Sequence, residues 1–426
     1  MSRVVVINHV TLDGVMQAPG RPDEDRRGGF EHGGWATPGG DDVMGAAMGA
    51  RMAESGGLLF GRRTYEDLLS YWNTQPDSPF TEPLNEARKF VASRTLREPL
   101  PWGNSTLLEG DAADAVADLK EQAGPDLHIM GSGELIQSLL RRALIDEYML
   151  MIHPLVLGTG RQLFPDGTAP TTLRLVDSNP TTTGVVIVTY RPVEPTAPAS
   201  ASSIESAETD VTGGSVRKLI VSNIVSLDGY FEGPGGNVMA LPMDGFFDEH
   251  NLERLRAADT LLLGAKTYRA LKGYWPAVAE NPEASPAVAA NPELADLHRE
   301  TGRRNNEIRK VVVSDSLTSA DTAPWTETTR IVRRGDARRV VAELKEEPGK
   351  EILMFGSRTL WNDLLRAELI DELHLMLGAS VLGDGTPTFA PGPPQSLRLV
   401  DSRRREGSDN LLLRYEVADR DGNLRR

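Results

Sequence analysis

The sequence repeats itself at about half its length, and this repeat constrains the fold more than any other feature. Motifs of the first half return in the same order in the second half. The matched segments are 8–14 with 223–229, 58–65 with 261–268, 71–72 with 274–275, 89–93 with 310–314, 144–147 with 369–372 and 173–178 with 397–402. Chance does not supply six ordered matches, so the chain of 426 residues contains a duplicated domain.

A change in composition marks the boundary between the two copies. Residues 191–216 hold a run of Pro, Ala, Ser and Thr, with one Ile and no aromatic residue. Such a segment buries too little apolar surface to offset its ordering entropy, so we expect a flexible tether. The predicted domains are therefore 1–190 and 217–426, and the chain is long enough for two.

Composition excludes several classes of protein. The 46 Lys and Arg against 61 Asp and Glu leave a formal charge of −15, which argues against nucleic acid or an anionic membrane as a partner. The absence of Cys excludes disulfides, a thiolate nucleophile and sulfur-ligated zinc or iron. The seven His lack metal-ligand spacing, so no metal site is predicted. We find neither an apolar run of membrane-helix length nor a signal peptide, and we expect a cytoplasmic protein.

Within the first copy, short apolar runs alternate with segments of helical periodicity. Strands are predicted at 3–9, 57–60, 89–92, 105–108, 127–130, 147–157, 173–176 and 185–190. Helices are predicted at 41–55, from about residue 63, at 112–122 and at 134–143, and 14–40 is a long loop rich in Gly and Pro. The alternation predicts an α/β fold in each copy, with a mainly parallel sheet flanked by helices and antiparallel strands at the end.

Parallel sheets bind ligands at the carboxyl ends of their strands, and one such junction is rich in small residues. It consists of Gly131, Ser132, Gly133 and Glu134. Glycines let the backbone approach a phosphate closely, and a helix N-terminus offers free N–H groups. A turn of this kind between a strand and a helix is also a common structural connection. Taken alone, the motif is more often such a connection than a phosphate site.

Two further junctions carry cationic or hydroxyl side chains. One passes from a strand into a helix at Gly61, Arg62, Arg63 and Thr64. Two arginines in a first helical turn oppose the macrodipole at a cost of about 0.3–1 kcal/mol each, which favours a bound anion over a solvated surface pair. Ser93 and Arg94 follow the next strand, where they either hold a ribose phosphate or cap a turn. Together the three junctions suggest a phosphate-rich ligand such as a dinucleotide.

The first strand of each copy ends in an acidic residue before a glycine. Asp13 and Asp228 occupy these positions, where an Asp-Gly turn and a catalytic carboxylate are about equally compatible with the sequence. Neither a Gly-x-Ser-x-Gly nucleophile elbow nor a Walker-type lysine loop is present. Acyl transfer by a serine elbow and P-loop chemistry are therefore not expected.

These motifs resemble the dihydrofolate reductase superfamily, in particular the branch similar to the C-terminal reductase domain of the riboflavin-biosynthesis deaminase-reductase. The resemblance is carried by 11–14, 61–66, the strand that ends at Ser93, 131–133, and 156–160 before 163–164. It covers nearly all of both copies. Deamination is excluded, because the zinc deaminase of that enzyme needs cysteines that this chain lacks.

The resemblance implies NADPH as hydride donor and assigns roles to individual residues. It places the cofactor phosphates near Arg62, Arg63 and Thr64, the adenosine end near Ser93 and Arg94, and the pyrophosphate at Gly131, Ser132 and Gly133. Asp13 would face nicotinamide and substrate. The 2′-phosphate would lie among the arginines, so we expect NADPH to be preferred over NADH.

In the second copy, the resemblance places the cofactor at Gly264, Lys266, Thr267, Ser314, Gly356 and Ser357. Three substitutions depart from the pattern: Ala265 for Arg62, Arg358 for Gly133 and Asp384 for Thr159. A bulky side chain at the pyrophosphate turn and an added negative charge both oppose phosphate binding. We therefore expect NADPH to bind the first copy tightly and the second weakly or not at all.

The expected function is that of an NADPH-dependent reductase, which transfers hydride to a C=N or C=O group of a small substrate such as a pterin- or pyrimidine-like ring. The alternative is a non-catalytic nucleotide- or ligand-binding protein, above all for the second copy. Related single-domain proteins resemble homodimers. The duplication is therefore expected to fuse two protomers into an intramolecular pseudo-dimer.

Overall fold

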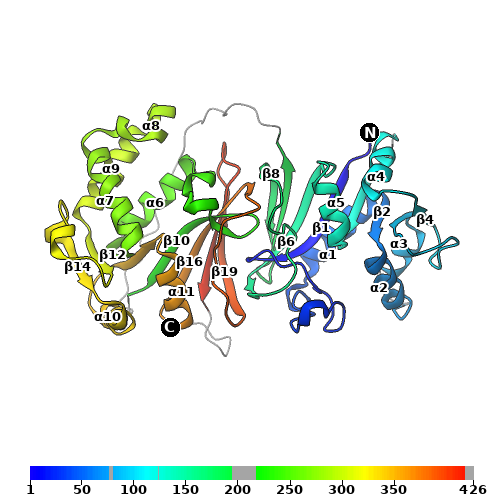
Figure 1. Cartoon of the computed structure of the whole chain (residues 1–426), viewed down its shortest axis with the longest axis horizontal. Helices are drawn as coiled ribbons and strands as arrows, with labels where there is room; N and C mark the ends of the chain where they lie inside the picture. Colours follow the sequence, from blue (N-terminus) through cyan, green and yellow to red (C-terminus); the bar gives the residue numbers. More distant parts are fainter. Residues whose placement is uncertain (76–79, 123, 194–216, 418–426) are drawn as a thin grey trace.

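The computed structural model describes residues 1–75, 80–122, 124–193 and 217–417. Figure 1 shows two lobes side by side, the first copy in blue to green and the second in green to red. Most of the tether predicted at 191–216 lies outside the described residues. Among the helices within the described ranges, none is long and apolar enough to cross a membrane.

The first copy alternates strands and helices as its periodicity predicts. Its strands are β1 (Val4–Thr11), β2 (Ser55–Gly61), β3 (Lys89–Ala92), β4 (Ser105–Leu108), β5 (Asp126–Met130), β6 (Glu147–His153), β7 (Leu155–Val156), β8 (Thr171–Pro180) and β9 (Val186–Pro192). Its helices are α1 (Asp42–Ala53), α2 (Arg62–Trp72), α3 (Thr81–Glu86), α4 (Ala112–Glu121) and α5 (Gly133–Leu140). The Asp41 carboxylate caps α1 by accepting a hydrogen bond from the N–H of Met44.

The second copy repeats this order and adds helices of its own. Its strands are β10 (Leu219–Ser226), β11 (Tyr230–Glu232), β12 (Ala258–Gly264), β13 (Arg309–Val313), β14 (Thr329–Val332), β15 (Glu351–Phe355), β16 (Glu372–Gly378), β17 (Ser380–Val381), β18 (Thr386–Pro387), β19 (Gln395–Arg403) and β20 (Leu411–Val417). Its helices are α6 (Gly245–Ala257), α7 (Ala265–Glu280), α8 (Pro286–Ala290), α9 (Ala295–Glu307), α10 (Ala337–Glu346) and α11 (Arg358–Arg366). The added segment is α8 and α9, and α9 packs against α6 and α7.

Each copy forms one large sheet with helices on both faces, which confirms the predicted α/β fold. The first sheet runs β17-β8-β9-β6-β1-β5-β2-β3-β4, and the second runs β14-β13-β12-β15-β10-β16-β20-β19-β7. The pairs from β6 through β1 to β4 are parallel, whereas β9 and β8 are antiparallel. Alternate residues of β1 serve different layers: Val5 and Ile7 pack with Met44 of α1, while Val4 and Val6 pack on the opposite face.

The strand predicted at 147–157 is wrong in one respect, because it is two strands in two different sheets. β6 ends at His153, and Pro154, which has no N–H to donate to a ladder, precedes the short strand β7. β7 pairs antiparallel with β19 of the second copy, and β17 pairs antiparallel with β8 of the first. The chain therefore exchanges short strands between its two halves.

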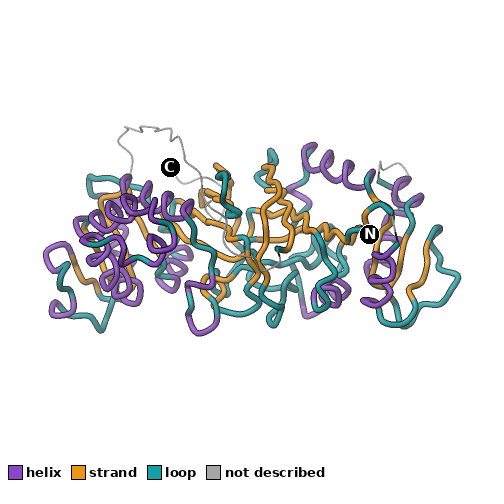
Figure 2. Tube along the Cα trace, turned by 90° about the horizontal axis from the view of Figure 1, so that it is seen from above, coloured by secondary structure: helices purple, strands orange, loops and turns teal. Residues whose placement is uncertain are grey.

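The exchange is nearly symmetric and lies over a shared apolar core. The N–H of Leu173 donates to the carbonyl of Ala379 at 2.8 Å, and the N–H of Leu397 donates to the carbonyl of Pro154 at 2.9 Å. One continuous cluster of buried side chains contains residues of both copies. In Figures 1 and 2 the strands of the two sheets meet at the centre of the molecule.

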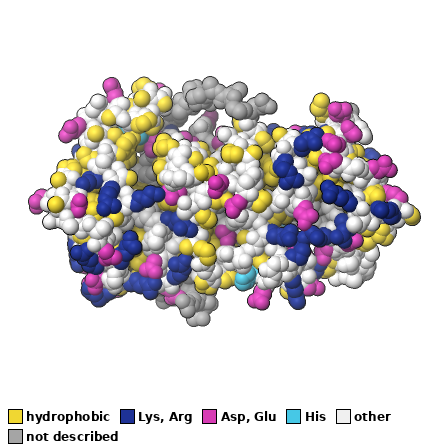
Figure 3. All heavy atoms as spheres, in the orientation of Figure 1, with side chains coloured by type: hydrophobic (Ala, Val, Ile, Leu, Met, Phe, Trp, Pro, Cys, Tyr) yellow, Lys and Arg dark blue, Asp and Glu magenta, His cyan; other side chains and the backbone are white. Residues whose placement is uncertain are grey.

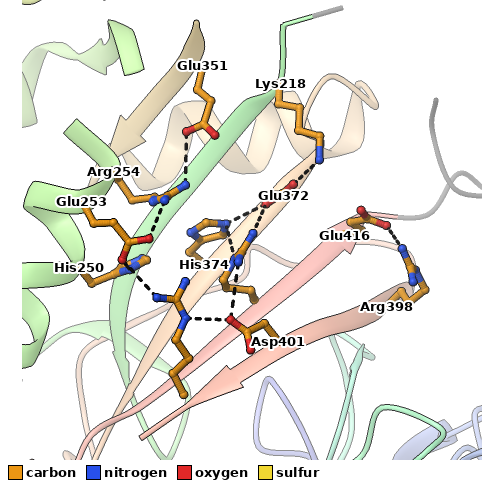
Figure 4. Close-up of polar contacts among 12 residues, drawn as sticks. Lys218, His250, Glu253, Arg254, Glu351, Glu372, His374, Arg398, Asp401 and Glu416 are labelled. Carbon is orange, nitrogen blue, oxygen red and sulfur yellow. Dashed lines mark hydrogen bonds and ion pairs between the residues drawn. The ribbon is translucent and has the colours of Figure 1, made fainter. Parts of the chain in front are cut away.

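A network of buried charges in the second copy includes a histidine (Figure 4). Glu372 of β16 contacts Lys218 at 2.6 Å, His374 at 2.9 Å and Arg414 at 3.5 Å. Burial lowers the pKa of His374 to about 4. Burial raises the pKa of Glu372, but the hydrogen bonds from His374 and Lys218 outweigh it and leave this pKa below the ordinary value. The first copy has a buried carboxylate at the strand position of Glu372. This residue, Glu147, contacts Arg3 at 3.1 Å, Arg51 at 2.6 Å and Arg191 at 2.7 Å. Strand register places Met149 of the first copy at the position of His374.

Because the exchanged strands bring the two copies into close contact, adding one methyl group at Gly383 should lower stability strongly. A Cβ added at Gly383, whose φ is +70°, would lie 1.8 Å from the carbonyl oxygen of Thr168 in the other copy. Gly407 has a φ of +80° and open space around the same position, so Gly407→Ala is the matched control. The control should lower the free energy of unfolding by about 1–2 kcal/mol, the usual cost of left-handed backbone. Gly383→Ala should cost clearly more in denaturant titration, and equal losses would contradict the described contact.

The buried network predicts sensitivity to acid. Because the pKa of His374 lies below its unfolded value, the unfolded chain binds a proton that the folded chain does not. Stability should therefore fall as pH decreases from about 6.5 to 4, by about 1.4 kcal/mol for each unit of the shift. His374→Met, which copies the first half, should make urea-derived stability fall less steeply over this range. His32→Asn, on the loop of the first copy, should leave the slope unchanged, and an unaltered slope in His374→Met would contradict the prediction.

Candidate functional site

The glycine-rich turn after β5 is held by three hydrogen bonds. The N–H of Gly131 donates to Asn8 Oδ1 at 2.9 Å, the N–H of Ser132 to Thr64 Oγ1 at 3.1 Å, and the N–H of Gly61 to Ser132 Oγ at 2.9 Å. Gly131 has a φ of +69°, and Ser132, the N-cap of α5, is left-handed as well. The turn thus joins four predicted residues from two separate segments, Gly61 and Thr64 from one and Gly131 and Ser132 from the other.

The same turn recurs in the second copy with nearly the same geometry. Gly356 donates to Asn223 Oδ1 at 2.7 Å, Ser357 to Thr267 Oγ1 at 2.9 Å, and Gly264 to Ser357 Oγ at 2.9 Å. Such agreement between two halves of different sequence indicates that the turn is a constrained feature of this fold.

In the first copy the turn offers several hydrogen-bond donors that could bind an anion. Thr64 and Ser132 use their oxygens as acceptors, so each hydroxyl retains a hydrogen to donate. The first N–H groups of α5 have no partner inside the helix, and the helix dipole favours negative charge there. Gly133 adds no side chain to the turn, and a Cβ there would lie 3.3 Å from the sulfur of Met16. These residues fit a phosphate of a dinucleotide.

Arginines from three segments converge beside this turn. Arg63 Nη1 lies 2.7 Å from Glu134 Oε1, and Arg27 and Arg161 lie 3.5 and 3.6 Å from the same oxygen. Burial raises the pKa of Glu134, but the hydrogen bond from Arg63 and the charges of all three arginines hold it below the ordinary value. The face of the first copy drawn in Figure 3 carries a dense group of Lys and Arg side chains, although the whole chain is acidic.

Sequence analysis found Arg62, Arg63 and Glu134 but missed Arg27 and Arg161. Arg62 forms an ion pair at 2.8 Å with Glu66 of its own helix. Of the two predicted arginines, only Arg63 forms an ion pair with a residue of the turn after β5. Arg27 and Arg161 lie in loops, where no periodicity or motif marks them. Their role depends on how two loops fold over α5.

The third predicted junction lies at the end of β3. Ser93 Oγ accepts hydrogen bonds from the N–H groups of Thr95 and Leu96, so this hydroxyl caps a turn, and Arg94 is exposed beside it. Ser314 Oγ makes the same turn with Ser316 and Leu317. Since β5, β2 and β3 are neighbours in the sheet, the three junctions lie along one edge.

In the second copy the corresponding edge is filled by the chain itself. The Arg358 guanidinium donates to the carbonyl oxygens of Pro387 and Phe389. Lys266 Nζ lies 3.0 Å from Glu232, which also accepts from Thr386 Oγ1 at 3.0 Å. β11 and β18, which hold Glu232 and Thr386, pair with each other here. The Arg358 side chain is thus engaged by the backbone of its own copy, whereas Lys266 is paired but remains largely exposed.

The carboxylates of Asp13 and Asp228 bind the backbone directly after the exchanged strands β7 and β17. Asp13 accepts from the N–H of Gly158 at 2.7 Å and of Leu157 at 3.2 Å, and Asp228 accepts from Gly383 at 2.7 Å. Both are followed by a glycine with positive φ, and the two turns touch each other, because a Cβ on Gly14 would lie 3.5 Å from the Asp228 carbonyl oxygen. Burial raises the pKa of Asp228. This geometry favours the Asp-Gly turn over the catalytic carboxylate, the two alternatives left open above.

The fold is that of a duplicated α/β protein, and comparison with known proteins identifies its family. The model of the RibD C-terminal domain matches residues 3–187 and 217–412, so the chain belongs to this family and carries the domain twice. Protein YyaP of Bacillus subtilis (strain 168) is 30% identical over 138 residues, which are 31% of this chain and 72% of YyaP. Protein YwjB of the same organism is 36% identical over 70 residues, 16% of this chain and 40% of YwjB.

Solved structures also resemble this chain at low sequence identity. A pyrimidine reductase-like protein from Corynebacterium diphtheriae aligns with 15% identity and a TM-score of 0.32, over 48% of this chain and 92% of that one. A diaminohydroxyphosphoribosylaminopyrimidine deaminase/5-amino-6-(5-phosphoribosylamino)uracil reductase from Thermotoga maritima aligns with 13% identity and a TM-score of 0.32, over 47% of this chain and 57% of that one. Within the described ranges, no group of three or more acidic or histidine side chains is placed to hold a metal ion.

The contacts of Asp13 predict a structural effect of its substitution. Asp13→Asn places an amide N–H₂ where backbone N–H groups of Leu157 and Gly158 now donate, and should lower the free energy of unfolding by about 1–3 kcal/mol. Asp42→Asn, at an exposed first-turn position of α1, is the matched control and should change stability by less than about 0.5 kcal/mol. Thermal or urea unfolding measures both variants. A stable Asp13→Asn protein would return this residue to the catalytic candidates.

Proposed function

We propose that the protein is an NADPH-dependent reductase that reduces a C=N or C=O group of a small molecule, with its working site in the first copy. The observation that carries this proposal is the Gly131–Ser132 turn beside Arg63, Arg27 and Arg161, at the carboxyl edge of a sheet of the RibD C-terminal domain family. When bound, the cofactor supplies hydride. The chain binds and orients it and keeps water away.

Three features support a phosphorylated dinucleotide over a neutral ligand. Thr64 and Ser132 retain hydroxyl hydrogens at the turn, and α5 begins there with free N–H groups. Arg62 and Arg63 lie in the first turn of α2, where their charges oppose the helix dipole; each is paired with one carboxylate, and both side chains remain partly exposed to an incoming anion. A cofactor with a 2′-phosphate brings the additional negative charge that these arginines match.

For the second copy we propose a partner role without cofactor binding. Arg358 fills the position of Gly133 and donates to backbone carbonyls, and Lys266 is paired with Glu232. The second copy contributes β17, which pairs with β8 as the outermost strand of the first sheet. In this proposal the two copies work as a fused pseudo-dimer with one active half.

Calorimetry tests both the cofactor and the asymmetry. We expect about one tight NADPH site per chain, and Gly131→Arg should abolish it. Arg62→Ala with Arg63→Ala should weaken NADPH at least tenfold more than NADH, since each charge-assisted hydrogen bond contributes about 1.5–3 kcal/mol. Arg142→Ala, which removes an exposed arginine paired with Asp114, is the control.

The reductase itself is tested by oxidation of NADPH with a cyclic imine, a cyclic enone and a dihydropterin as acceptors. Binding without turnover of any acceptor would favour the non-catalytic nucleotide-binding alternative. Two equal NADPH sites per chain would overturn the assignment of the second copy as an inactive partner. Equal losses for NADPH and NADH in the double arginine variant would mean that these side chains do not bind the 2′-phosphate.

A further inference from the structure

A pair of histidines lies on the other side of β1 from the phosphate turn. Asn8 faces the turn and accepts from Gly131, and neighbouring residues of a strand point to opposite faces. His9 therefore belongs to the face of Val5 and Ile7, which packs against α1. Its Nδ1 lies 2.9 Å from Nε2 of His153, at the end of β6.

The two imidazoles differ in their access to solvent. His153 is 2% exposed and contacts the edge of the Trp35 ring, with ring centroids 5.1 Å apart, while His9 is only partly buried. Burial lowers the pKa of His9 to about 4, and burial together with the charge of His9 lowers that of His153 to about 3. The imidazole of His9 is thus the more solvent-accessible of the two, and the buried imidazole of His153 holds it by a hydrogen bond.

The pair is confined to the copy whose phosphate turn is open. Strand register places Ile224 at the position of His9 and Gly378 at that of His153. The loop of the second copy that follows β10 holds no tryptophan between 229 and 243. The second copy, where Arg358 replaces Gly133, has no imidazole at either position. Its own pair, His250 of α6 and His374 of β16, lies elsewhere on the sheet, and both rings are buried.

Carboxylates close to this edge are already committed to backbone contacts. Asp13 accepts from Leu157 and Gly158, and Asp41 accepts from the N–H of Met44 and from the N–H and hydroxyl of Thr182. The side of α1 facing the sheet carries Met44 and Met48, which have no proton to give. Among these side chains, His9 is the one with an accessible ionisable proton.

We propose that His9 is the proton donor of the reduction and that His153 is its positioning residue, an inference that rests on the reductase function proposed above. The electrophilic carbon of the acceptor gains hydride from the dihydronicotinamide, and the π electron pair moves to its nitrogen or oxygen. That atom takes a proton from the His9 imidazolium, which becomes neutral. The pair then takes a proton from solvent, while the hydrogen bond to His153 keeps the ring in place.

The test uses the full chain and the acceptor that wild-type protein reduces fastest among the imine, the enone and the dihydropterin. Because the donating form is the imidazolium and the pKa of His9 is about 4, wild-type turnover should fall about tenfold per pH unit throughout the range above pH 5. His9→Asn should lose about 100-fold in turnover at pH 6 and lose this slope. His153→Gln should shift the profile, and His32→Asn, in the neighbouring loop, should change neither. Calorimetric NADPH affinity should stay within twofold in every variant.

A second readout needs neither cofactor nor acceptor. In ¹⁵N-histidine-labelled protein, a scalar coupling across the N–H···N bond should link His9 Nδ1 with His153 Nε2, and His153→Gln should remove it. Full turnover with an unchanged pH slope in His9→Asn, or no coupling in wild type, overturns this assignment and leaves the reductase proposal intact. Absence of turnover in wild type overturns the reductase proposal and this one with it.

Discussion

After Pro154 the chain leaves the sheet of its own domain and adds β7 to the sheet of the other copy, and β17 does the reverse. Without this exchange β8 and β19 would be exposed edge strands, with unpaired N–H and C=O groups open to association. The exchange also brings the apolar faces of both sheets into one buried cluster. Neither half therefore has a complete sheet without the other.

The same exchange explains where the long loop of the first copy lies. Asp13 binds the N–H groups of Leu157 and Gly158, so the start of that loop is tied to the segment that follows the crossing strand. From this anchor the loop places Met16 against Gly133 and Arg27 beside Glu134. The edge that we propose binds phosphate is thus assembled from segments that the domain contact holds in position.

Comparison of the two copies shows which residues the fold requires and which positions are free to differ. Both halves keep the asparagine, threonine and serine that build the turn after β5 or β15, because these side chains satisfy backbone groups. Gly133 and Arg358 differ, because this position contributes no hydrogen bond to the turn itself. It faces Met16 in the first copy and the carbonyls of Pro387 and Phe389 in the second. A second copy that still supplies β17 and its share of the core can change its binding edge without loss of the fold. His374, beside the buried Glu372, stands where the first copy has Met149, so the interior of the second copy has changed at this position as well.

The sequence by itself determined the duplication, the α/β class and nearly every element of the first copy, because these follow from repeats, from periodicity and from turn residues over a few positions. It also located the turns at Gly61, Ser93 and Gly131. Tertiary structure decided the remainder: the break at Pro154, the convergence of Arg27 and Arg161, and the contact of His9 with His153 across 144 positions. Such contacts depend on how sheets, loops and copies pack, and no local pattern specifies which distant side chains that packing brings together.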